Sequence, residues 1–144
     1  MSKPCLGFDF GEKRIGIAVG HRLTGTASPL LTLTAVNDKP DWESIARLIE
    51  EWQPDSCVVG LPLNMDGSET STTARAKRFA RQLESRFGVA VFMTDERLTS
   101  AIATQHIREG REKGTRGKTR KGDDDKIAAA LILEQWLESS VESS

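Results

Sequence analysis

Short apolar segments separated by turn residues dominate the first third of the chain. Two of them, residues 5–10 and 14–20, flank Gly11-Glu12-Lys13 and predict a β-hairpin. Residues 24–35 contain several side chains that favour β-structure and predict a third strand. Pro29 in this segment favours an edge strand or a β-bulge, because proline has no N–H group to donate to a neighbouring strand.

Helical spacing begins after Asp41. Apolar residues then recur every three or four positions from Trp42 to Ile49, and Pro54 ends the predicted helix. The other predicted elements are strands over 56–60 and 89–93, a helix between them that ends at Gly88, a short helix around 98–102 and a last helix over about 124–137. Three strands in a meander, followed by alternating helices and strands, predict an α/β fold with a mixed sheet. We expect one domain over residues 1–138 and a flexible tail over 139–144.

Charge is unevenly distributed along the chain. The net charge is −1, but residues 108–122 contain seven Lys and Arg residues against two Glu residues. Four glycines and no large apolar side chain in residues 109–122 predict a flexible loop. A local basic segment on a mildly acidic chain indicates contact with a polyanion.

The two cysteines, Cys5 and Cys57, lie in predicted buried strands and match no metal-ligand spacing, which is typical of core residues in a reducing compartment. No apolar run reaches membrane-spanning length, and the N-terminus lacks the apolar region of a signal peptide. We therefore expect a cytoplasmic protein that does not bind membranes.

Asp9 is the first candidate for chemistry. It stands inside a predicted strand between Phe8 and Phe10, where an ionised carboxylate is costly unless a cation or hydrogen bonds satisfy it. Gly11 removes a side chain nearby, so that a phosphate or a metal ion could approach the backbone. Two interpretations remain open: a hydrogen-bonded Asp at a strand end, or a metal ligand that needs further carboxylates from elsewhere in the chain.

The last predicted helix offers a second carboxylate. Its apolar face consists of Ala129, Ile132, Leu133 and Trp136, and four residues before Ala129 this face continues at Asp125. Asp123 and Asp124, which precede Asp125 directly, point away from this face, and a favourable interaction with the helix dipole explains them.

Either Asp95 or Glu96 offers a third candidate carboxylate. Strand alternation sends them to opposite sides, so only one can join Asp9, and the pattern does not decide which. Carboxylates from two strands and a helix suit Mg²⁺ or Mn²⁺. Zinc is not favoured, because His21 and His106 are isolated and there is no Cys/His cluster.

Four segments together resemble the YqgF family, also called RuvX, whose members are RuvC-like proteins of the ribonuclease H-like superfamily. The segments are residues 7–19 (GFDFGEKRIGIAV), 60–67 (GLPLNMDG), 95–100 (DERLTS) and 125–134 (DKIAAALILE). They follow one another at compatible spacing and span nearly the whole chain. The resemblance implies a ribonuclease H-like fold, with a five-stranded mixed sheet of three antiparallel strands and two parallel ones, flanked by helices.

The resemblance also implies a nuclease that trims the 5′ end of pre-16S ribosomal RNA, with Holliday-junction or other structured-DNA resolution as the alternative. By matching position, the catalytic and metal-binding carboxylates would be Asp9, Glu96 and Asp125, which selects Glu96 over Asp95. Phosphodiester hydrolysis fits such a set, since two divalent ions roughly 3.5–4 Å apart can activate water and stabilise the leaving oxygen. The implied partners are pre-rRNA or structured DNA and ribosomal particles, with the protein acting as a monomer or a weak homodimer.

Several basic and polar residues are candidates for nucleic-acid binding. They are Lys13, Arg14, Asn64, Arg97, Arg116, Lys118, Arg120 and Lys121. Arginine can bind two phosphate oxygens at once, but a surface ion pair explains Arg14 and Arg97 nearly as well. A turn-capping role explains Asn64 equally well. The arginines of the second predicted helix are expected mainly to form a solvated face, with nucleic-acid binding as the alternative.

Two other function classes remain. A phosphotransferase of the actin and sugar-kinase type has a similar Asp-x-Gly hairpin, but it needs two such domains to close over a nucleotide, and this chain has room for one. A non-catalytic nucleic-acid-binding module could keep the fold without turnover. Metal-dependent cleavage, with an acid-site mutant as the control, distinguishes that module from a nuclease.

Overall fold

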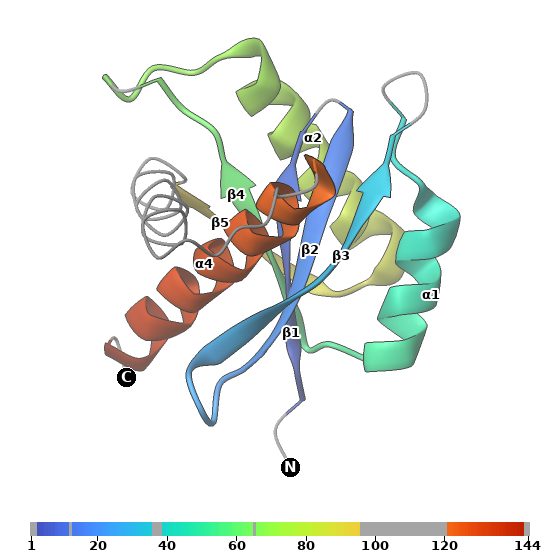
Figure 1. Ribbon diagram of the computed structural model, residues 1–144, viewed down its shortest axis with the longest axis vertical. Coiled ribbons are helices and arrows are strands. Elements are labelled where there is room, and N and C mark those ends of the chain that lie inside the picture. Colours follow the sequence, from blue (N-terminus) through green and yellow to red (C-terminus); the bar gives the residue numbers. More distant parts are fainter. Residues whose placement is uncertain (1–2, 12, 36–38, 65, 96–120, 143–144) are drawn as a thin grey trace, which may run out of the picture.

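A five-stranded sheet between two layers of helices forms the centre of the molecule (Figure 1). The computed structural model describes residues 3–11, 13–35, 39–64, 66–95 and 121–142. The strands are β1 (Cys5–Phe10), β2 (Arg14–His21), β3 (Thr26–Thr34), β4 (Ser56–Leu61) and β5 (Ala90–Asp95). Their order across the sheet is β3-β2-β1-β4-β5. β1, β2 and β3 pair antiparallel, whereas β4 and β5 run parallel to β1, so the predicted mixed sheet is confirmed.

β3 is an edge strand with an irregular register. Ala18 pairs with Pro29, but the preceding residue, Ile17, pairs with Leu31, so one residue of β3 is left over at this point. Both outcomes expected of Pro29 therefore occur together, at the place where a missing N–H donor costs the sheet least.

Local signals define the ends of the two helices that precede β4 and β5. α1 (Trp42–Trp52) begins after Asp41, whose side chain accepts a hydrogen bond from the Ser44 backbone N–H, and it ends at Gln53 in a left-handed conformation. α2 (Ser71–Phe87) begins with a capping box formed by Thr70 and Thr73 and ends at Gly88, whose φ of 64° suits glycine.

The larger core lies between the sheet and helices α1 and α2. Strand alternation sends Leu6, Phe8 and Phe10 of β1 into this layer, together with alternate residues of β2 and β4. The fully buried ring of Phe79 from α2 contacts Phe8 edge-on, with 5.6 Å between the ring centroids. Cys57 belongs to the same core, and burial raises the pKa of its thiol to about 12, so the sulfur stays protonated at neutral pH.

The second core lies under a single helix, α4 (Lys121–Glu142), which crosses the other face of the sheet (Figure 1). Its predicted apolar face is confirmed: Ala129, Ile132 and Leu133 are fully buried, and Trp136 packs beside them. The helix begins earlier than predicted and continues past Leu137 to Glu142, because neither Gly nor Pro follows Leu137 to end it.

Several predicted features lie outside the described residues, namely the short helix around 98–102 and the basic loop as far as residue 120. Within the described part of the chain, no helix is long and apolar enough to cross a membrane. Cys5 and Cys57 are both buried and unpaired, as the sequence predicts.

Candidate active site

Asp9 lies on the face of the sheet that α4 covers. Successive residues of β1 point to opposite faces of the sheet, so that Cys5, Gly7 and Asp9 face α4 while the intervening residues enter the larger core. Asp9 is half-buried near the carboxyl end of β1, where its register partner on β2 is Gly16. The aromatic residues that flank Asp9 in the sequence therefore point away from it.

Gly16 of β2 lies opposite Asp9 of β1 and contacts the beginning of α4. A Cβ atom at this position would lie 2.0 Å from the carbonyl oxygen of Asp125 and 2.7 Å from the backbone nitrogen of Lys126. Helix and strand are therefore in direct backbone contact, which only glycine permits. Because Asp9 and Gly16 are directly opposite each other in the sheet, this contact brings Asp125 to the same edge of the sheet as Asp9.

The contact at Gly16 was missed by the sequence analysis. A signal for it exists in β2, where Gly16, Ala18 and Gly20 occupy alternate positions on one face. Gly7 on β1 belongs to the same surface, and a Cβ atom there would lie 2.8 Å from Cβ of Leu133. A face built of such small residues is typical of a surface against which another backbone packs closely.

Arg14 pairs directly with one of the candidate carboxylates. Its Nε donates a hydrogen bond to Oδ2 of Asp125 over 2.8 Å, and the two side chains are 39% and 25% exposed. The ion pair expected as one alternative for Arg14 is thus present, but it involves Asp125 rather than an unrelated surface residue. The pair compensates the charge of Asp125 and fixes the position of one of its oxygens.

Asp95 lies at the end of β5, where the alternation of the strand continues from Val91 and Met93. Those two residues pack against the larger core, on the side of α2, so the backbone of β5 directs Asp95 to the face opposite Asp9. Asp95 is therefore not placed to join Asp9 and Asp125. Glu96 and Arg97, the alternative carboxylate and its basic neighbour, lie outside the described residues.

The structure describes only some of the remaining candidates for nucleic-acid binding. Lys13 is exposed in the hairpin turn, and its carbonyl accepts a hydrogen bond from the backbone N–H of Ala35. Asn64 is exposed and holds a turn: its Nδ2 donates to Oγ of Ser68 over 2.9 Å, and its carbonyl accepts from the Gly67 N–H. Arg116, Lys118 and Arg120 lie outside the described residues, and Lys121 is the first residue of α4.

The chemistry of the donors suits a hard divalent cation. Asp9 and Asp125 both offer carboxylate oxygens, the ligands that Mg²⁺ and Mn²⁺ prefer. Within the described ranges, no group of three His, Cys, Asp or Glu side chains comes together, so a third ligand would have to come from a residue outside them. Two carboxylates and an arginine at one edge of a sheet can bind a cation and a phosphate group side by side.

Sequence comparison finds relatives over almost the full chain. A protein from Shewanella oneidensis is 50% identical over 138 residues and covers 96% of both chains, and one from Klebsiella pneumoniae is 49% identical over 140 residues, covering 97% of this chain and 99% of its own. Both carry the name "Putative pre-16S rRNA nuclease".

Solved structures with the same fold include RuvC of Thermus thermophilus in complex with a Holliday junction substrate, at a TM-score of 0.54, 15% identity and 96% coverage of both chains. The fowlpox virus Holliday junction resolvase also has a TM-score of 0.54, at 16% identity, and the match covers 96% of this chain and 99% of that one. The chain therefore has the ribonuclease H-like fold of these resolvases. The family model RuvX, described as Holliday junction resolvase, matches residues 3–139. The chain belongs to the RuvX family.

Proposed function

We propose that this protein is a metal-dependent nuclease that hydrolyses phosphodiester bonds and processes the 5′ end of pre-16S rRNA. The observation that carries the proposal is the backbone contact at Gly16, which brings Asp125 of α4 to the edge of the sheet that holds Asp9. The names of the relatives support the choice of RNA substrate. The two free, buried cysteines are compatible with action in the reducing environment of the cytoplasm.

Asp9 and Asp125, together with Glu96, would hold Mg²⁺ or Mn²⁺. Such ions, when bound, activate a water molecule and neutralise charge on the attacking and leaving oxygens. The protein's own contribution is to fix the two carboxylates on rigid elements, a central strand and a helix that are packed backbone against backbone. This arrangement needs little reorganisation when the substrate arrives.

Arg14 is suited to bind the phosphate group next to the ions. Only its Nε is used by Asp125, and its terminal nitrogens have no ion-pair or hydrogen-bond partner within the part of the chain that the structure describes. A guanidinium group has five N–H donors, so the terminal ones can bind phosphate oxygens while Nε holds Asp125. Arg14 would thus connect the position of the carboxylate to that of the scissile phosphate.

Arg14→Gln is expected to lower kcat/KM for RNA cleavage by roughly 10- to 100-fold, since hydrogen bonds to charged groups contribute about 1.5–3 kcal/mol. Steady-state kinetics at fixed ionic strength measure the loss. Arg22→Gln is the matched control, because Arg22 is also 39% exposed and forms an ion pair with Asp55 at 2.5 Å, but it lies just beyond the opposite end of β2. Equal activities of the two variants would remove Arg14 from substrate binding.

Cleavage of matched substrates tests the proposed function directly. The purified protein is incubated with a 5′-extended pre-16S rRNA fragment or a four-way DNA junction of similar length, in Mg²⁺, in Mn²⁺ or in EDTA. We expect RNA cleavage that requires a divalent ion. Cleavage of the junction alone would favour the resolvase alternative, which the RuvC-like fold supports. If neither substrate were cleaved with either ion, the chain would be a binding module.

A further inference from the structure

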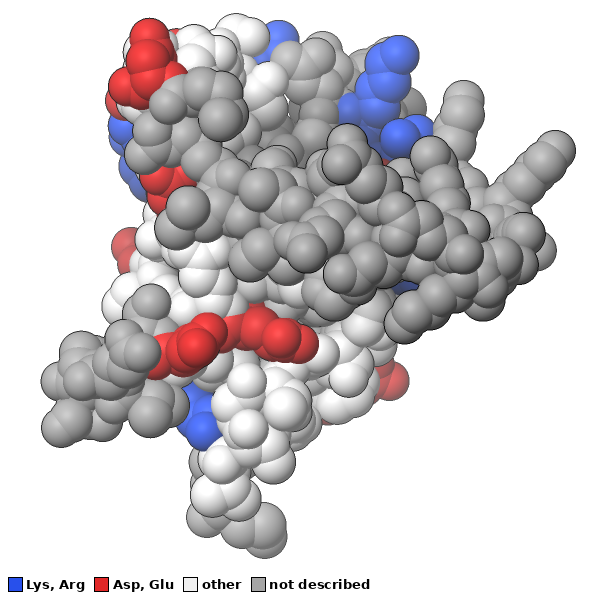
Figure 2. Space-filling model, turned by 60° about the vertical axis from the view of Figure 1, so that its left-hand side comes forward, with Lys and Arg blue, Asp and Glu red and all other residues white. Residues whose placement is uncertain are grey.

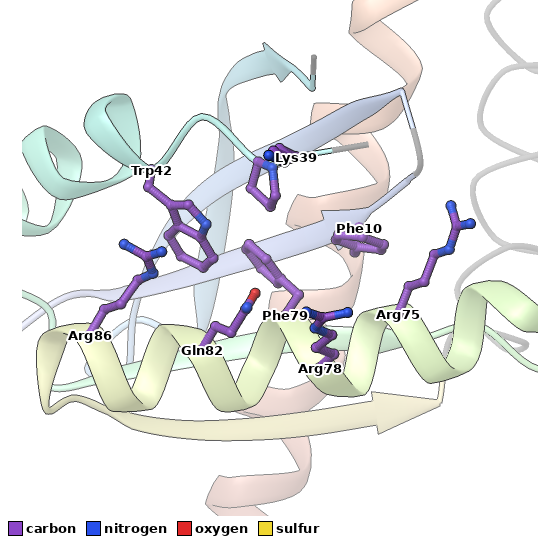
Figure 3. A pocket seen from close by; sticks show the side chains of 9 residues that line it. Phe10, Lys39, Trp42, Arg75, Arg78, Phe79, Gln82 and Arg86 are labelled. Atoms are coloured by element: carbon purple, nitrogen blue, oxygen red, sulfur yellow. The ribbon is translucent and has the colours of Figure 1, made fainter. Parts of the chain in front are cut away.

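A pocket of about 520 Å³ lies on the face of the sheet away from Asp9, between the segment that enters α1 and helix α2 (Figure 3). Phe10 and Phe79 contribute to its apolar lining, and Trp42 forms one wall. Its size falls within the range of about 300–1,000 Å³ that is usual for binding sites of small molecules. The candidate active site does not use this pocket.

The charged residues that line the pocket are all basic: Lys39, Arg75, Arg78 and Arg86. Among its described lining residues there is no Asp or Glu, although the whole chain has a net charge of −1. Figure 2 shows a contrasting face, on which described acidic and basic side chains both occur among uncharged ones. Four cations around one cavity repel each other, and an anion bound between them would relieve this repulsion.

Two of these cations are available to a ligand. Arg78 and Lys39 are exposed, and neither forms an ion pair within the described ranges of the chain. Two basic residues outside the pocket do have acidic partners: Arg47 pairs with Glu43 and Lys77 with Glu69. Lys39 and Arg78 therefore bring two charges without an ion pair to the pocket; Arg81, which is exposed on α2 outside the pocket, has no ion pair within the described residues either.

Aromatic rings hold a third cation in place. Trp42 stacks on Phe79, with 5.3 Å between the ring centroids and 21° between their planes. Cζ of Arg86 lies 4.4 Å from the centroid of the Trp42 ring, and Figure 3 shows the two side chains next to each other. A cation–π contact of this kind restricts the guanidinium before any ligand arrives, which lowers the entropy cost of binding.

We propose that this pocket binds single-stranded RNA outside the active site. Arg78 and Lys39 bind backbone phosphates, and an unpaired base stacks on the guanidinium plane of Arg86, which Trp42 supports. Bases without a pairing partner commonly stack on arginine or aromatic side chains, whereas bases within a duplex are not available for such stacking. The choice of RNA rests on the proposed function. Phe10 in the pocket directly follows Asp9 in β1, so the pocket and Asp9 lie at the same end of this strand but on opposite faces of the sheet.

Binding is measured in EDTA, so that cleavage does not interfere, by fluorescence anisotropy of a short labelled single-stranded RNA. We expect Arg78→Gln to raise Kd roughly tenfold and Arg78→Gln combined with Lys39→Gln to raise it further. Each lost phosphate contact should reduce the slope of log K against log salt by about 0.7. Arg47→Gln is the matched control, because it makes the same charge change on an exposed helix position that does not line the pocket.

Equal Kd values for Arg78→Gln and Arg47→Gln would overturn the proposal. A loss of affinity for duplex RNA as large as that for single-stranded RNA would overturn the single-strand assignment. If Arg78→Gln instead abolished a dimer seen by analytical ultracentrifugation and left RNA binding unchanged, the pocket would be an interface between two copies of the chain. The outcome is independent of the proposed catalysis: a specific binding loss in a protein that cleaves nothing would support the pocket and refute the nuclease.

Discussion

Asp9→Asn is expected to reduce RNA cleavage by more than about 100-fold while the protein remains folded. Loss of a residue that only orients a metal ligand costs 10- to 100-fold, so loss of a ligand itself should cost at least as much. Asn keeps the shape of Asp but loses the charge that holds a divalent cation. Single-turnover cleavage at saturating Mg²⁺ or Mn²⁺ measures the effect.

Asp41→Asn is the matched control for Asp9→Asn. It removes the same charge, and Asn replaces Asp well at the N-terminal cap of a helix such as α1, so activity and stability should stay near wild type. Cleavage by Asp9→Asn at the wild-type rate would exclude Asp9 from the mechanism. The same prediction applies to Asp125→Asn and to Glu96→Gln.

Thermal melting provides a readout for Asp9→Asn that needs no substrate. In EDTA the variant should melt at or slightly above the wild-type temperature, because removing one of several like charges relieves repulsion. The gain should be small, since Arg14 already compensates Asp125. Mg²⁺ or Mn²⁺ should raise the melting temperature of the wild type more than that of the variant, because a ligand stabilises the state that binds it. A variant clearly destabilised in EDTA, with no metal response in the wild type, would contradict a metal site at Asp9.

Gly16→Ala is expected to destabilise the protein by about 1–3 kcal/mol and to abolish most cleavage. The new Cβ atom would lie 2.0 Å from the carbonyl oxygen of Asp125 and 2.2 Å from its carbonyl carbon. Both are backbone atoms, so α4 must move away from β2 and take Asp125 with it. Urea unfolding measures the change in stability, and kinetics below the melting transition measure the change in activity.

Gly7→Ala separates loss of packing from loss of the site. Its Cβ atom would lie 2.8 Å from Cβ of Leu133 and 3.0 Å from the carbonyl oxygen of Ala129, so it disturbs the same helix two turns further along. We expect a comparable loss of stability but a smaller loss of activity in the folded protein. If Gly16→Ala retained wild-type activity, close contact between Gly16 and Asp125 would not be needed for cleavage.

The sequence alone determined the elements whose signals are local. The hairpin around Gly11, the cap at Asp41, the end of α2 at Gly88 and the edge position of Pro29 each depend on a few neighbouring residues, and all are present in the structure. The apolar stripe that begins at Ala129 also predicted which side of α4 is buried, because helical period is readable from spacing alone.

For the candidate site, spacing identified Asp9 and Asp125 as candidates but could not show that they lie at one edge of the sheet. That depends on the pairing of Asp9 with Gly16 and on the contact of Gly16 with Asp125, across more than a hundred residues of sequence. Strand alternation predicted that Asp95 and Glu96 point to opposite faces of the sheet. Only the packing of Val91 and Met93 against the larger core showed which face Asp95 points to.

The ion pair of Arg14 with Asp125 and the pocket beside Trp42 were likewise decided by the tertiary structure. In both, the interacting side chains come from elements that are distant in the sequence and are brought together by the sheet. Local spacing specifies which residues an element exposes on each face, whereas partners depend on how the faces of separate elements pack. From the sequence, the arginines of α2 were therefore predicted to form a solvated face. The tertiary structure places three of them around a pocket that Trp42 and Lys39 also line.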